Sequence, residues 1–125
     1  MEKLEYIPGD LVFHYIPKTT IKKYVKVYVC STNNALSLED MDGKLYDYIG
    51  VLYPIPLTPE ILEKNEWKKL YEKFFEKNVN NIRLTIEFSE NIYVAINRIF
   101  IMEIHYIHEL QHLLFGLGLN SEMEV

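Results

Sequence analysis

The clearest chemical signature in this chain stands near its C-terminus, where His108-Glu109-Leu110-Gln111-His112 matches the H-E-x-x-H pattern of zinc peptidases. In that pattern two histidines one helical turn apart bind the metal, and the glutamate activates a water molecule. Helical spacing places both imidazoles on nearly the same face. The motif therefore predicts, as one alternative, a zinc-dependent hydrolase with His108 and His112 as ligands and Glu109 as base.

The rest of the zinc pattern is incomplete. A catalytic zinc needs a third protein ligand, and no histidine stands at the extended spacing after His112. The acids downstream are Glu122 and Glu124, in a tail that we expect to be frayed. His105, Glu109 and His112 also share one surface of a helix, as an ordinary polar face would. The leading interpretation is therefore a scaffold helix without a metal or cofactor.

Composition restricts the classes of function further. The ten tyrosines, six phenylalanines and one tryptophan suit half-buried sheet faces, subunit contacts and pockets that stack flat ligands. A net charge of −5 argues against a nucleic-acid binder that relies on phosphate neutralisation. The single Cys30 excludes an internal disulfide and fits a reducing compartment, and no apolar stretch is long enough to span a bilayer. We therefore expect a cytoplasmic protein that does not enter membranes.

The first half of the chain is predicted to be rich in strands. A turn at Pro8-Gly9-Asp10 precedes a strand over residues 11–16, and residues 24–30 alternate valines with polar or aromatic side chains. Residues 31–42 are rich in turn formers and end at Asp42-Gly43, a hairpin signal, after which residues 44–53 form a third strand. Three short strands after a Gly-Asp turn are compatible with an SH3-like barrel.

The second half is predicted to place a helix before and after antiparallel strands. Thr58-Pro59-Glu60 starts a helix that runs to about residue 76, with an apolar stripe at Trp67, Leu70, Tyr71 and Phe74; a break near Asn65 is the alternative. Three strands form a meander, and a closing helix packs on the sheet. These elements span residues 82–88, 92–96, 99–104 and, for the helix, from 103 or 105 to 115. The predicted fold is one α+β domain over residues 1–125.

Two stretches resemble a family of small proteins from gut Bacteroidales and their prophages. The first is the box from Pro54 to Asn65, and the second is the closing box from Tyr106 to Phe115, followed by a short acidic tail. In those relatives the closing box resembles Y-V-H-Q-L-Q-N-L, so the resemblance implies that a zinc site would be peculiar to this chain. A glycine commonly follows Asn65 in the family, and Glu66 at that position implies that the first helix runs straight on.

The resemblance and the missing catalytic set lead to one leading hypothesis. The chain is a non-enzymatic phage or mobile-element accessory protein, a homo-oligomer that binds a small ligand. Its concrete form is an anti-defence sponge that sequesters nucleotide immune signals, because such a pocket needs aromatic faces for bases and donors for phosphates. A protein–protein interaction module is the other non-enzymatic alternative. The candidate ligand-binding residues are Trp67, Arg83, Tyr93, Arg98, His108 and Gln111.

Overall fold

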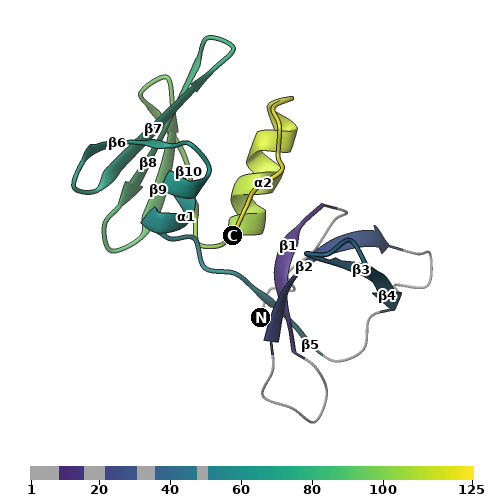
Figure 1. Ribbon diagram of the computed structural model, residues 1–125. Helices are drawn as coiled ribbons and strands as arrows, with labels where there is room; N and C mark the ends of the chain where they lie inside the picture. The colour runs from purple at the N-terminus through teal and green to yellow at the C-terminus, as the bar shows by residue number, and fades with distance from the viewer. Residues whose placement is uncertain (1–8, 16–21, 31–35, 48–50) are drawn as a thin grey trace. The chain divides into compact units, whose positions relative to one another are not determined.

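The computed structural model describes residues 9–15, 22–30, 36–47 and 51–125 (Figure 1). The chain divides into two compact units, Met1–Ile55 and Pro56–Val125, and each contains one antiparallel sheet. Both helices found in the described residues belong to the second unit, and neither is long and apolar enough to cross a bilayer. The predicted α+β class with a C-terminal helix is confirmed, whereas the single domain stays a prediction.

The first unit contains a five-stranded sheet with the strand order β4-β3-β2-β1-β5. Its strands are β1 (Leu11–Tyr15), β2 (Lys22–Cys30), β3 (Leu36–Asp40), β4 (Leu45–Asp47) and β5 (Val51–Pro54). Val12, Val25, Val27 and Leu38 are buried together, as the two-residue period of β2 predicts for one face of a sheet. The SH3-like form of this unit stays a prediction.

Two details of the first unit differ from the prediction. The strand expected over residues 44–53 is two strands, β4 and β5, and β3 lies within the stretch expected to be turns. The Asp42-Gly43 turn is confirmed, because Asp40 Oδ1 accepts hydrogen bonds from the backbone N–H groups of Asp42 and Lys44 at 2.9 Å each. Gly43 has a φ of 83°, which favours glycine. Pro8 and Ile16, parts of the predicted turn and first strand, lie outside the described residues.

The second unit contains a five-stranded meander with the order β10-β9-β8-β7-β6. Its elements are α1 (Pro59–Lys64), β6 (Lys68–Tyr71), β7 (Phe74–Val79), β8 (Ile82–Phe88), β9 (Ile92–Ile96), β10 (Ile99–Ile104) and α2 (Ile107–Gly116). The three strands predicted from alternating apolar residues are β8, β9 and β10, and the closing helix is α2. The sheet is two strands wider than predicted.

The predicted helix over residues 58–76 is wrong beyond Lys64. Thr58 caps α1 by accepting a hydrogen bond from the Ile61 N–H at 3.3 Å, but the helix ends before Asn65. Glu66 then has a φ of 69°, a left-handed conformation in which a helix cannot continue. The alternative of a break near Asn65 is therefore confirmed, and the expectation that the helix runs straight on through Glu66 is wrong.

Local hydrogen bonds close the end of α1, since the Glu66 N–H donates to the Glu63 carbonyl at 3.2 Å and the Trp67 N–H donates to the Leu62 carbonyl at 3.0 Å. The C-terminal tail is bound beside this helix end. The Asn65 side-chain amide donates to the Glu124 carbonyl and accepts from the Glu124 N–H, both at 2.8 Å, and it also donates to the Ile61 carbonyl. Gln111 Nε2 donates to the Ser121 carbonyl at 3.1 Å. The tail is therefore hydrogen-bonded to α1 and α2, and the expectation of a frayed tail is wrong.

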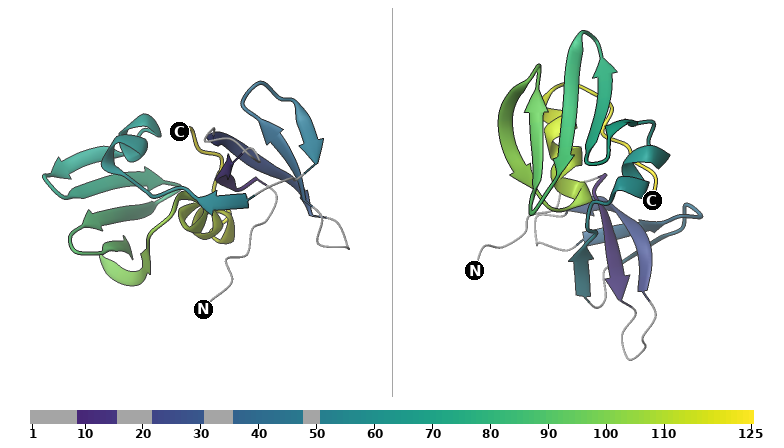
Figure 2. Two further views of the ribbon diagram at one scale, coloured as in Figure 1. Left: turned by 90° about the horizontal axis from the view of Figure 1, so that it is seen from below. Right: turned by 90° about the vertical axis from the view of Figure 1, so that its left-hand side faces the viewer.

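The second sheet has one covered face and one open face. Phe75, Leu84, Ile86 and Val94 are buried on its inner face, and α2 lies along the sheet with its own apolar stripe buried (Figure 2). The opposite side, called the outer face below, carries the alternate side chains of β7 to β10. None of these described outer side chains is buried, so the outer face is a surface on which this unit could bind a ligand.

Candidate ligand-binding site

The outer face is arranged in three rows, which follow from the strand register. The first row is Asn78 on β7, Arg83 on β8 and Asn97 beyond β9. The second row is Glu76, Thr85, Ala95 and Phe100. The third row is Phe74, Glu87, Tyr93 and Glu103. Neighbouring rows are roughly 7 Å apart, since each is two residues further along the strands.

A polar cavity of about 500 Å³ opens at the first row. Its lining is Asn78, Asn80, Asn81, Arg83, Asn97 and Arg98, and we call it the asparagine–arginine cavity. Six side chains that carry amides or guanidinium groups provide many hydrogen-bond donors and two permanent positive charges. Such a lining is suited to an anion.

Two hairpin turns build this cavity. Asn80-Asn81 connects β7 to β8, and Asn97-Arg98 connects β9 to β10; all four residues have positive φ angles between 49° and 71°. Two-residue turns of this kind match the twist of the strands and favour asparagine over most other residues. Because β8 pairs with β9, both turns lie at the same end of the sheet.

Backbone hydrogen bonds fix the second turn to β8. Asn97 Oδ1 accepts from the Arg83 N–H at 2.9 Å, and the Asn97 N–H donates to the Arg83 carbonyl at 2.8 Å. These bonds therefore fix the turn that carries Arg98 beside Arg83 at one end of the sheet. This geometry is formed by the protein alone, so a ligand would not have to order it.

The charges of the cavity do not cancel. Arg83 Nε lies 3.1 Å from Glu76 Oε1, and Asn78 Nδ2 donates to the same oxygen at 2.9 Å. The Glu76 side chain is only 15% exposed and is not among the residues that line the cavity, so it orients Arg83 from outside the lining. Arg98 has no ion pair within the part of the chain that the structure describes. One positive charge is thus left over.

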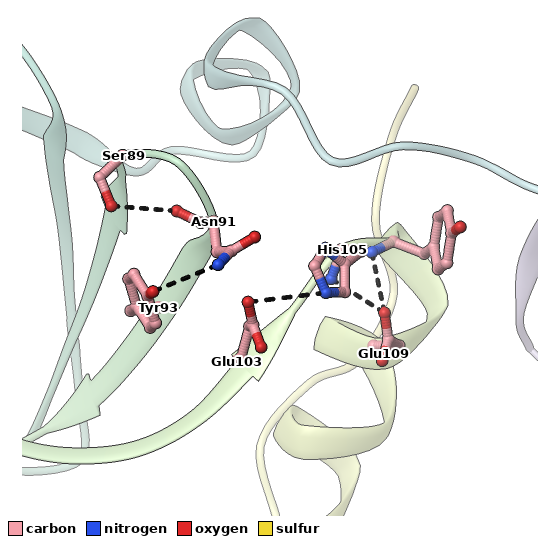
Figure 3. A network of polar contacts seen from close by, with 7 residues as sticks. Ser89, Asn91, Tyr93, Glu103, His105 and Glu109 are labelled. Atoms are coloured by element: carbon pink, nitrogen blue, oxygen red, sulfur yellow. Dashed lines mark hydrogen bonds and ion pairs between the residues drawn. The ribbon is translucent and has the colours of Figure 1, made fainter.

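The third row continues into a network of polar contacts (Figure 3). Tyr93 packs edge-on against Phe100, with ring centroids 5.7 Å apart, and its hydroxyl accepts from Asn91 Nδ2 at 3.3 Å. Glu103 Oε1 lies 3.8 Å from His105 Nε2. Phe100 is 60% exposed, so its ring is available on the same face as the two arginines.

The H-E-x-x-H residues lie on α2, away from this row arrangement. The His108 and His112 rings are 5.5 Å apart at 78°, and Tyr106 stacks on the buried His108 with centroids 5.9 Å apart. Glu109 Oε1 accepts hydrogen bonds from the backbone N–H groups of His105 at 2.9 Å and Tyr106 at 3.0 Å. These two bonds cap the start of α2, a structural role for the residue that the zinc alternative needs as its base.

Among the described residues, no three histidine, cysteine, aspartate or glutamate side chains are grouped so that they could hold a metal ion. Glu122 and Glu124 belong to the tail segment, whose backbone at Glu124 is bound by Asn65. Of the groups that a zinc hydrolase needs, the described residues therefore provide two histidines as possible ligands. The glutamate that would act as the base is engaged in capping α2.

The structure brings together only part of the predicted ligand set. Arg83 and Arg98 both line the asparagine–arginine cavity, and Tyr93 lies on the same face two rows away. Trp67 is 4% exposed and belongs to the core, and His108 and Gln111 are buried on α2. The predicted six residues thus divide among three places in the second unit.

Sequence reasoning missed the asparagines and Phe100. The Asn80-Asn81 pair between two alternating apolar runs is a turn signal that could have been recognised, as Asn97-Arg98 was. Phe100 stands among isoleucines that are equally apolar, and only the register places it on the face of Arg83.

No protein-family model, curated protein or solved structure gives a significant match to this chain.

Proposed function

We propose that this chain is a non-enzymatic binding protein for a small anionic ligand, held in the asparagine–arginine cavity. The observation that carries the proposal is the meeting of Arg83, Arg98 and four asparagines at one end of the second sheet. Guanidinium groups pair well with phosphate or carboxylate oxygens, and amide N–H groups complete their hydrogen bonding.

The lining also supports binding instead of catalysis. Asparagine side chains do not titrate, and arginine keeps its proton at any physiological pH. None of the six residues that line the cavity is therefore a nucleophile or a general acid or base. A protein that only sequesters its ligand needs nothing more, which agrees with the hypothesis of a phage accessory protein that removes a signalling molecule.

The test is a titration of the full chain with inorganic phosphate, followed by NMR of the asparagine side-chain amides. We expect the amide signals of the cavity to shift, and we expect binding to weaken as ionic strength rises. Arg98→Asn should weaken binding about tenfold, because one charge-assisted hydrogen bond contributes at least about 1.5 kcal/mol. Asparagine is the right replacement, since Arg98 has a φ of 71° that alanine tolerates poorly.

Lys69→Ala is the matched control, since it removes an exposed cation from β6, an edge strand that contributes no residue to the lining of the cavity. It should leave phosphate binding unchanged. Amide signals that ignore phosphate, or an Arg98→Asn variant that binds as well as the wild type, would refute the proposal.

One observation favours the interaction module as a second candidate. Ile99, Phe100 and Ile101 of β10 are 66%, 60% and 46% exposed, and β10 is an edge strand. Exposed apolar edge strands pair readily with other chains. The opposite edge, β6, carries the exposed Lys68 and Lys69, which disfavour such pairing. A homo-oligomer formed through β10 is the specific form of this candidate.

A further inference from the structure

The second row of the outer face forms a low floor beside an aromatic wall. Thr85 and Ala95 lie opposite each other in the register, and Phe100 lies opposite Ala95 on the edge strand. These two small side chains leave the Phe100 ring 60% exposed, so part of the ring is open to contact with a flat molecule. Base–aromatic contacts of this kind are a general way to hold a nucleobase.

This floor adjoins the asparagine–arginine cavity directly. Thr85 follows Arg83 by two residues on β8, and Phe100 follows Arg98 by two residues, so the two sites are about one row, roughly 7 Å, apart. A phosphate bound by the arginines would therefore have any attached ring system within reach of Phe100.

We infer that the anionic ligand is a nucleotide, with its phosphate in the asparagine–arginine cavity and its base on the Thr85–Ala95 floor against Phe100. The inference rests on the proposed function, because it assigns the ligand class of that same cavity. It adds a role for Phe100, which contributes stacking and no charge.

The third row limits the size and kind of the nucleotide. Glu87 and Glu103 lie on either side of Tyr93 in the register, so two carboxylates stand beyond the floor. Carboxylates accept hydrogen bonds from the exocyclic amino groups of bases and repel a second phosphate. A single nucleotide whose base carries an amino group fits this order of cavity, floor and carboxylates. A longer strand would place further phosphates close to Glu87 and Glu103. The net charge of −5 also disfavours binding of a longer strand, which carries many phosphates.

Isothermal titration calorimetry of the full chain with four compounds tests this inference. They are AMP, IMP, ribose 5-phosphate and a single-stranded oligodeoxyadenylate. We expect AMP to bind roughly tenfold more tightly than ribose 5-phosphate, because base stacking adds to phosphate binding. AMP should also bind more tightly than IMP, which lacks the exocyclic amino group, and more tightly than the oligonucleotide per site.

Phe100→Ala should remove the advantage of AMP over ribose 5-phosphate while leaving ribose 5-phosphate binding unchanged. Phe115→Ala is the control, since Phe115 is an equally exposed phenylalanine on α2, at 68%. If ribose 5-phosphate binds as tightly as AMP, or the oligonucleotide binds more tightly, the nucleotide inference is overturned and the anion cavity stands. If none of the phosphate compounds binds, both proposals fail.

Discussion

Glu109 is a cap in the scaffold interpretation and a base in the hydrolase interpretation, and its replacement tests the capping role directly. Its carboxylate accepts two backbone N–H groups at the start of α2, at 2.9 and 3.0 Å. Glu109→Ala leaves both donors without this partner and removes a negative charge from the positive end of the helix. We therefore expect the second unit to lose stability.

The magnitude follows from the geometry. Removal of a helix-capping side chain costs about 0.5–2 kcal/mol, and two charge-assisted bonds to a half-buried carboxylate place Glu109 in the upper part of that range. A loss of about 1.5 kcal/mol corresponds to a drop of roughly 6–12 °C in the melting temperature of a unit of this size. Glu109→Gln keeps one oxygen acceptor without the charge, so its melting temperature should lie between those of the wild type and Glu109→Ala.

The chain provides its own probe for the assay. Trp67 is the only tryptophan in the sequence and is buried in the second unit, so its fluorescence follows the unfolding of that unit whether or not the first unit unfolds with it. Glu90→Ala is the control, because Glu90 is an exposed acid in the turn between β8 and β9. A Glu109→Ala variant as stable as the wild type would refute the capping role.

Two further predictions concern the start of α1 and the edge of the second sheet. Thr58→Ala removes the oxygen that accepts the Ile61 N–H, so it should cost about 0.5–2 kcal/mol of stability in the same fluorescence assay, while Thr58→Ser should cost much less. If β10 pairs with a second copy, light scattering should show an assembly that Ile101→Lys converts to a monomer and Leu70→Lys, on the opposite edge strand, does not; a monomeric wild type would contradict pairing.

The elements that could be predicted from the sequence are those whose pattern of apolar residues is compatible with only one type of secondary structure. The strict alternation from Ile82 to Phe88 predicts β8, and the apolar stripe that ends before Gly118 predicts α2. Trp67, Leu70, Tyr71 and Phe74 match a helical period by spacing alone. In the structure Leu70 and Tyr71 are exposed on a strand, so the match was accidental.

Some residues of the candidate site could be predicted from the sequence, but their arrangement in space could not. Arg83 and Arg98 were identified as ligand candidates, yet their proximity depends on the hydrogen bonds between Asn97 and Arg83. Strand register of this kind is set by non-local pairing and turn geometry, which a single sequence does not reveal. His108 and Gln111 were selected for their polarity, whereas their burial on α2 follows from tertiary packing.

The left-handed Glu66 has a consequence for how the second unit folds. A residue with a side chain is disfavoured at a φ of 69°, so the local hydrogen bonds that close α1 at Glu66 and Trp67 carry a conformational cost. The contacts of Asn65 with Glu124, which form later in the chain, help to offset that cost. Before those contacts exist, the segment from α1 to Phe74 has the composition and period of one long helix. Local helical preference and the final topology therefore compete in this segment.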